Sequence, residues 1–394
     1  MESQSILNDM KIKASWGRNG NQGLSPYGTL STINNAAAAG ARYQFGNSSA
    51  ILYGMVPGAL GNADLGWETT ESWNFGFETA LLENKLFFDV DAYFSKTTDQ
   101  IFERNIPVMT GFKTIRSSMG QINNRGIEIT LRNVNIETRD LRWMTSLTYW
   151  FNRNKLVHLY GEDLDGDGKE DDDIANSRFI GKPLGVIYGY VQDGIVQETD
   201  TEYISKNKVS PGVPKYKDIT GDGIIDADDR DILGYTTPNF KLNMSNTVSY
   251  KNFDLYAMIT GTFGGGGFYL RENREAYMTN GSGLFNSNSI YVPWWTPENK
   301  SNKYPSATFS GDGGRFRGLQ NRGFVRLQDV TLSYTFREKW VKDMNISNLK
   351  VFFTAKNLFT ITNWEGDDPE VGSAVRANTY PISSSFSLGA NISF

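Results

Sequence analysis

The stretch FSLGANISF, residues 386–394, alternates between apolar and polar side chains with a period of two. Its apolar members share one face of an extended strand: Phe386, Leu388, Ala390, Ile392 and Phe394. The opposite face carries only small or polar groups, because Ser, Gly and Asn occupy the positions between them. The stretch therefore predicts a β-strand that lies between an apolar and a polar environment.

The same alternation recurs at nine other places in the chain. These segments lie near residues 10–16, 73–77, 86–94, 127–131, 143–151, 240–250, 253–263, 330–336 and 349–359. With flanking residues, each strand is about 10–13 residues long, close to the ~9–11 that cross a bilayer when tilted. A soluble β-sandwich also alternates, so the alternation alone does not separate the two folds.

The connections between the predicted strands alternate in length. Long polar stretches near 19–70, 97–120, 153–238, 264–321 and 361–382 alternate with short links near 82–85, 134–141, 251–252 and 337–347. Outer-membrane barrels show this pattern, with short periplasmic turns and long extracellular loops, whereas a sandwich has no reason to sort its loops. We therefore predict an all-β fold, an antiparallel transmembrane β-barrel with about ten strands in this sequence, long extracellular loops and short periplasmic turns.

Composition excludes several other classes of protein. The chain has 394 residues, no cysteine and a single histidine, His158, which rules out disulfides, a thiol nucleophile and a multi-histidine metal site. The net charge of −5 gives no basic footprint for nucleic acid. No run of about 20 apolar residues is present, which excludes a helical membrane protein.

Five segments, in order, then resemble a known family. They are NADLGWETTESWNFGFE (62–78), GQINNRGIEITL (120–131), GVPKYKDITGDGIIDADDRDILGYTTPNF (212–240), WWTPENKSNKYP (294–305) and VFFTAKNLFTITNWEGDDPE (351–370). Together with the terminal Phe394, they resemble TonB-dependent outer-membrane transporters of the SusC/RagA type.

The resemblance implies a fold, a location and partners. Residues 1–394 would be the C-terminal part of a barrel of roughly 22 strands, with the plug domain and the N-terminal strands missing from this sequence. The whole protein would import oligosaccharides or peptides across the outer membrane of a Gram-negative bacterium, embedded in its lipid. A SusD-like surface lipoprotein would cap it, and the TonB complex would act through the missing N-terminal region. Phe394 would be the membrane insertion signal.

The segment KYKDITGDGIIDADDRDILG, residues 215–234, follows the spacing of a calcium loop. Side-chain oxygens would come from Asp218, Thr220, Asp222, Asp226 and Asp229, and a backbone carbonyl from Ile224. Pro211 and Pro214 precede the loop, so a helix–loop–helix calcium sensor is not expected. A set of Asp and Gly turns in a solvated loop remains the alternative.

A second acidic run, DLDGDGKEDDD at 163–173, has similar spacing. Its candidate ligands are Asp163, Asp165, Asp167 and Asp171, but the twelfth position is Ile174 rather than an acid. Both runs fall within the single long extracellular loop predicted at 153–238. Calcium is the one cofactor that the sequence suggests.

Two adjacent tryptophans, Trp294 and Trp295, are candidates for a substrate site because an indole face can stack on a sugar; packing within the loop is the alternative. No catalytic residue is predicted, so we do not expect an enzyme. Two further readings remain open at this stage: a secreted glycoside hydrolase that carries calcium loops, and a carbohydrate-binding surface adhesin.

Overall fold

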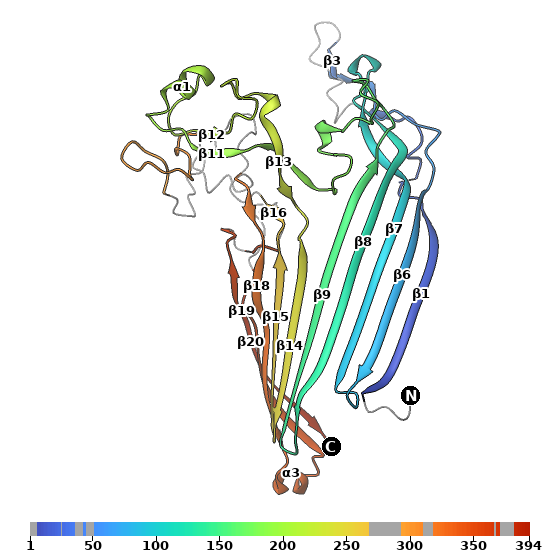
Figure 1. Ribbon diagram of the computed structural model, residues 1–394, viewed down its shortest axis with the longest axis vertical. Helices are drawn as coiled ribbons and strands as arrows, with labels where there is room; N and C mark the ends of the chain where they lie inside the picture. The colour runs from blue at the N-terminus through green and yellow to red at the C-terminus, as the bar shows by residue number, and fades with distance from the viewer. Residues whose placement is uncertain are drawn as a thin grey trace.

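The structure, a computed structural model, describes residues 6–24, 26–35, 42–44, 51–267, 293–309, 318–365, 368–370 and 382–394. Its main feature is one ten-stranded antiparallel sheet (Figure 1). In order across the sheet, the strands are β1 (Leu7–Asn21), β6 (Glu68–Leu81), β7 (Leu86–Asn105), β8 (Thr114–Glu137), β9 (Leu141–His158), β14 (Phe240–Tyr250), β15 (Phe253–Phe263), β18 (Phe324–Phe336), β19 (Asn348–Thr362) and β20 (Ser385–Ser393). The ten strands predicted from alternation are confirmed.

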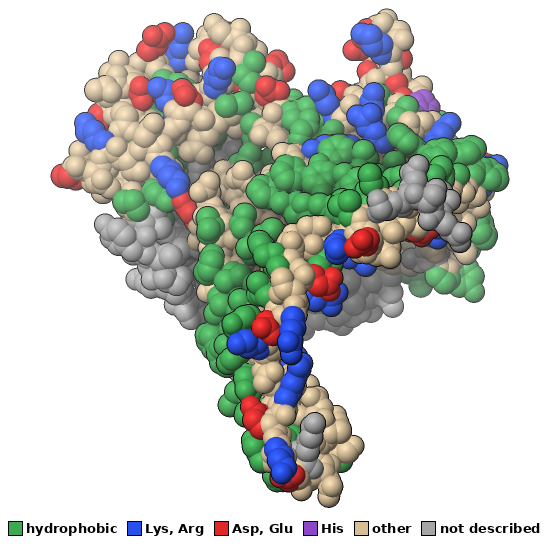
Figure 2. Space-filling model, turned by 60° about the horizontal axis from the view of Figure 1, so that its bottom comes forward, with side chains coloured by type: hydrophobic (Ala, Val, Ile, Leu, Met, Phe, Trp, Pro, Cys, Tyr) green, Lys and Arg blue, Asp and Glu red, His purple; other side chains and the backbone are tan. Residues whose placement is uncertain are grey.

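The strand register places the apolar side chains on one face of the sheet. Trp16 lies opposite Trp73, and Trp73 lies opposite Phe94, so three strands present an aromatic row at one height. Large apolar side chains on this face stay exposed, among them Ile12, Phe75, Leu255, Phe353 and Leu388. Figure 2 shows wide areas of hydrophobic side chains over the strands. Lipid is the environment that such a face requires.

The opposite face of the same strands is polar. Lys13 Nζ lies 2.7 Å from a Glu78 carboxylate oxygen and 3.4 Å from a carboxylate oxygen of Asp91. Farther along the sheet, the hydroxyl of Thr260 donates a hydrogen bond of 2.6 Å to Asn243. This face is the lumenal side of the wall, where charged groups keep polar partners.

All the short connections lie at one end of the sheet and the long ones at the other (Figure 1). The tightest is the hairpin of β14 and β15, in which Tyr250 pairs with Phe253 and only two residues form the turn. Lys251 adopts a φ of 53° there, which a two-residue hairpin turn requires. The helix α3 (Lys339–Asp343) occupies the link at the same end. Phe394, 89% exposed, also lies at this end.

One connection differs from its prediction. The long loop expected near 97–120 is largely strand, because β7 continues to Asn105 and β8 begins at Thr114. The segment TTDQIFERN contains no Gly or Pro, so ladder pairing continues past the membrane boundary, interrupted only by register shifts near Gln100. Pro107 follows and has no N–H to donate, which ends the ladder. The remaining connection, 106–113, contains the short helix η1 (Val108–Thr110).

The other long connections carry small elements of their own. β2 (Ile33–Asn35) pairs with β5 (Met55–Pro57), and β3 (Arg42–Gln44) pairs with β4 (Ile51–Tyr53). The loop after β9 contains η2 (Ile174–Asn176), β10 (Val186–Tyr190), β11 (Gln192–Ile195), α1 (Thr201–Asn207), β12 (Pro214–Tyr216), η3 (Ala227–Asp229) and β13 (Arg230–Tyr235). β16 (Gly266–Gly267) pairs with β17 (Gln320–Asn321). Among the described residues, no helix is long and apolar enough to cross a membrane.

The sheet curves but does not close on itself (Figure 1). Its two edges are β1, which pairs only with β6, and β20, which pairs only with β19, in the part of the chain that the structure describes. An open edge within lipid leaves backbone N–H and C=O groups without partners, so these edges require further strands beside them.

The two faces predict opposite responses to a buried charge. Leu147 lies midway along β9 on the apolar face, and Thr148 faces the lumen beside it. In the full-length protein folded into lipid vesicles, Leu147→Lys should lower the free energy of unfolding by about 2–4 kcal/mol. Thr148→Lys, the matched control, should cost far less. Denaturant titration measures both; equal losses would contradict the assignment of faces.

Candidate functional site

Three long loops share a hydrophobic core at the extracellular end of the barrel wall. Tyr216 and Ile225, from the loop after β9, are buried together with Trp364, which follows β19. Partly buried side chains pack against them: Tyr190, Tyr203, Trp294, Tyr304 and Phe309. We call this body the cap and define it as residues 186–235, 293–309, 363–365 and 368–370. It lies at the loop end of β14, β15, β18 and β19 (Figure 1).

The two tryptophans predicted as a substrate site both lie within the cap. Trp295 is 7% exposed, and its indole N–H donates a hydrogen bond of 2.9 Å to Gln197. Its ring also lies close against Gly212, where an added Cβ would approach to 2.5 Å. Trp294 packs against the buried cluster. In this arrangement both indoles contact protein, and Trp295 offers almost no surface to a ligand.

The cap is tied to the lumenal wall through Arg326 on β18. This guanidinium is 1% exposed and donates to Asp368 at 2.8 Å, to Glu370 and to the hydroxyl of Thr360 at 2.9 Å. A buried cation that lost its carboxylate partners would remain desolvated without compensation, so the ion pairs hold the segment after β19 against the wall. Lys303 and Gln320 both donate to Glu365, which connects two cap loops in the same way.

The predicted calcium loop at 218–229 folds around its own backbone. Asp218 accepts hydrogen bonds from the N–H groups of Gly221 and Gly223, at 2.6 and 2.7 Å. Asp222 accepts from the N–H of Ile224 at 2.7 Å, and Asp226 accepts from that of Asp228 at 2.9 Å. No helix pair flanks the loop, since β12 precedes it and β13 follows it. This agrees with the expectation against a helix–loop–helix sensor.

Asp229 is the centre of this loop. Its carboxylate is fully buried and accepts from the N–H groups of Ile219, Asp226 and Thr220 at 2.8, 2.9 and 3.1 Å, and from the Thr220 hydroxyl at 3.2 Å. The Asp226 N–H, assisted by those of Thr220 and Ile219, lowers the pKa of the Asp229 carboxyl despite the opposing effect of burial. Asp226 and Asp229 also form a reciprocal capping box for η3.

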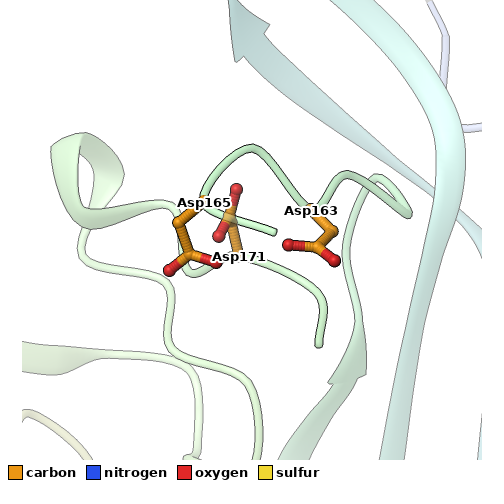
Figure 3. A group of neighbouring side chains, drawn as sticks. All are labelled: Asp163, Asp165 and Asp171. Carbon is orange, nitrogen blue, oxygen red and sulfur yellow. The ribbon is translucent and has the colours of Figure 1, made fainter. Parts of the chain in front are cut away.

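The second acidic run brings three carboxylates together. Asp163, Asp165 and Asp171 each place one oxygen within 4.8 Å of the others, and in the described part of the chain they are the only three acidic side chains that do so (Figure 3). The carboxylate of Asp167 is not part of this group and pairs with Lys169, whereas its backbone N–H donates to Asp163 and Asp165. Asp163 accepts hydrogen bonds from the N–H groups of Gly166 and Gly168, so the loop folds back onto this carboxylate.

Glu170, which the sequence did not single out, joins this acidic loop to the end of β9. It accepts from the N–H groups of Leu159 and Gly161, both at 2.7 Å, and pairs with His158. Burial opposes ionisation, but the backbone donors of Gly161 and Leu159 and the His158 ring together lower the pKa of Glu170. The single histidine therefore has a structural partner rather than a catalytic one.

Arg326 was also missed as an anchoring residue, although a signal for it exists. It occupies a lumen-facing position in a strand of alternating pattern, and a charged side chain within a membrane-spanning segment usually pairs with an opposite charge. Its partners, Asp368 and Glu370, lie 42 and 44 residues away in sequence, and no spacing rule connects them.

Comparison with known proteins assigns the family. The model of the TonB dependent receptor-like β-barrel matches residues 12–358. The chain belongs to the TonB-dependent receptor β-barrel family. It is part of an outer-membrane protein of a Gram-negative bacterium, and its relatives are receptors rather than enzymes. The predicted family, fold class and location are thereby confirmed, and the hydrolase alternative loses its support.

Individual relatives give the extent of the likeness. TonB-dependent receptor P3 of Formosa agariphila is 28% identical over 414 residues, covering 100% of this chain and 40% of that protein. TonB-dependent receptor SusC of Bacteroides thetaiotaomicron is 27% identical, covering 100% of this chain and 38% of that protein. The chain thus spans about two fifths of the curated relatives it matches.

A solved structure shares the fold. The RagAB peptide transporter superposes with a TM-score of 0.75 at 24% identity, covering 99% of this chain and 41% of that chain. This likeness supports the fold of the chain.

The burial of Asp229 predicts a strong and local effect of its removal. Asp229→Ala leaves several buried N–H groups without an acceptor, so protection of residues 215–235 in hydrogen exchange should fall by about 3 kcal/mol. Asp228→Ala, at an exposed neighbouring position, is the control and should change little.

The same carboxylate predicts the direction of the pH dependence. Because the folded pKa of Asp229 is lowered, its contribution to stability is present above the unfolded pKa of about 3.9 and is lost as the pH falls through the lower folded value. The free energy of protection in this loop, after correction for the intrinsic exchange rate at each pH, should therefore stay constant from neutral pH to about pH 4 and fall below it. Unchanged protection in strong acid would contradict this role.

Proposed function

We propose that the full-length protein imports oligosaccharides or peptides across the outer membrane with energy supplied through TonB. The observation that carries this proposal is the family match over residues 12–358, in a chain aligned from end to end with SusC. The lumenal face adds support, since it is lined by charged and polar groups suited to a wet passage.

The barrel of the whole protein would be larger than the described sheet. The curated relatives are about two and a half times as long as this chain, which covers 40% of one and 38% of another. The free edges of β1 and β20 are the places where further strands would pair, because backbone groups in lipid must find partners within the protein. A plug domain and the segment that contacts TonB would lie in the same additional length.

We further propose a SusD-like lipoprotein as the extracellular partner. The cap presents folded, internally packed loops at the extracellular end rather than isolated flexible ones. A pre-ordered surface binds a protein partner with a smaller entropy loss than a disordered one. The relatives named SusC and RagAB motivate the choice of partner class.

Uptake by whole cells tests the import proposal. In the source bacterium, deletion of the full-length gene should abolish uptake of at least one labelled oligosaccharide or peptide from a panel, and deletion of tonB should have the same effect. Complementation with the intact gene is the control. Uptake that persists without TonB, for a substrate lost with the gene, would refute energised transport.

We propose, second, that calcium binds the acidic runs. Asp163, Asp165 and Asp171 supply convergent carboxylates of the kind that calcium prefers. At the other run, the ligands would be Asp218, Thr220, Asp222, Asp226, Asp229 and the Ile224 carbonyl. In both runs the carboxylates are engaged with backbone N–H groups, so each loop would have to exchange hydrogen bonds for metal contacts.

Calorimetry with calcium measures this binding. Asp171→Asn retains an acceptor for the N–H of Leu164 but removes a charge, and should weaken binding at the first run about tenfold. Asp222→Asn should do the same at the second run. Asp193→Asn, an exposed aspartate outside both runs, is the control. If the intact protein produces no calcium-dependent heat, the proposal fails.

A further inference from the structure

A hollow on the outer surface of the barrel wall contains side chains that import does not use. It has a volume of about 940 Å³ and lies against β6, β7, β8 and β9. Its floor includes Trp73, Phe94 and Phe151, all on the lipid-facing side of their strands. Loop residues near 181–183 and 235–239 form its other wall. The lumen lies on the opposite face of the sheet.

The hollow exists because two neighbouring strands separate above it. β14 begins at Phe240, and its last pair with β9 joins Lys241 to Trp150. Between Phe151 and Lys155, β9 therefore has no strand partner on that side. At Leu156 its backbone is hydrogen-bonded again, to Gly181 and Lys182 of the loop that follows β9. Arg153 bridges the gap by donating to the Asn239 carbonyl at 2.9 Å and to its side chain at 3.1 Å.

Four cations surround the hollow at this height. They are Lys96, Arg125, Arg153 and Lys155, against a single carboxylate, Glu71, which accepts from the indole of Trp16. Within the described part of the chain, Lys96, Arg125 and Lys155 form no ion pair. The patch is thus strongly positive, although the chain as a whole has a net charge of −5.

Two of these cations repel each other. Arg125 on β8 lies directly opposite Arg153 on β9, and like charges at directly opposed positions destabilise a sheet. An anion placed between them would convert this repulsion into attraction, and two guanidinium groups suit a phosphate. Arg153 has neutral partners, the oxygens of Asn239 and the ring of Phe151, but in the described part of the chain no carboxylate pairs with either arginine.

The height of the patch relative to the membrane identifies the kind of anion. Trp16, Trp73 and Phe94 form a row across β1, β6 and β7, and Phe151 adjoins it on β9; such aromatic rows mark the membrane–water interface. Arg125 and Arg153 lie at the level of this row. Lys96 and Lys155 occupy the next outward-facing position of their strands, on the side of the loops. Head groups of the outer leaflet occupy that layer.

We propose that this hollow binds the phosphorylated head group of an outer-leaflet glycolipid. Arg125, Arg153 and Lys155 would contact the phosphate, and the acyl chains would lie over Trp73, Phe94 and Phe151. The site recognises a structural lipid and is separate from the transport path, so it does not depend on the proposed import.

Native mass spectrometry of the full-length protein in detergent tests the proposal. The probes are bisphosphorylated lipid A, its dephosphorylated counterpart and inorganic phosphate. The double variant Arg125→Gln and Lys155→Gln leaves the Arg153 bridge intact and should bind bisphosphorylated lipid A about tenfold more weakly. The matched control, Lys11→Gln with Lys241→Gln, removes the same charge from the lumenal face and should bind normally.

Three outcomes would overturn the proposal. Equal binding of phosphorylated and dephosphorylated lipid would exclude recognition of the phosphate. Displacement of the lipid by millimolar inorganic phosphate alone would indicate a site for soluble anions. Equal affinity in the outer-face and lumenal variants would place the lipid elsewhere. Heat-modifiable gel mobility shows that each variant is folded before it is measured.

Discussion

Every backbone N–H and C=O group that crosses a bilayer must find its hydrogen-bond partner within the protein, and the rest of this structure depends on that constraint. It selects a continuous antiparallel ladder from β1 to β20. The ladder in turn fixes which side chains face lipid, because side chains alternate across it. Loops can be long only where the ladder has left the membrane, and the cap is built there.

Outside the membrane, a different interaction organises the chain. The cap has few long strands or helices. There, carboxylates accept many of the backbone hydrogen bonds that neighbouring strands accept in the wall. In the cap, Asp229 accepts hydrogen bonds from three backbone N–H groups, and Arg326 on the wall pairs with Asp368 and Glu370. Outside the cap, in the acidic run after β9, Glu170 accepts from two more. These groups join residues that no strand brings together. The acidic runs are thus structural in their own right, whether or not an ion joins them.

The outer surface of the wall carries a group of cations that the fold does not explain. A wall that did no more than face lipid tails would need only apolar residues and two aromatic rows. The cations beside the upper row are not required by the ladder, and Arg125 opposite Arg153 works against it. Two like charges held directly opposite each other point to an anionic ligand, and their position relative to the aromatic row indicates its chemistry.

The sequence by itself determined the ten strands, their faces and the end at which the long loops lie, because a period of two is a local property that each strand carries in its own residues. The sequence did not predict that β7 and β8 extend beyond the membrane, because strands of polar residues can pair in water without the apolar alternation that marks a strand in lipid. Only the tertiary structure decided that Asp163, Asp165 and Asp171 converge, that Trp295 is buried, and that Arg326 meets Asp368. Those contacts join residues through folded loops, whose paths depend on side-chain packing and hydrogen bonds rather than on any repeating pattern.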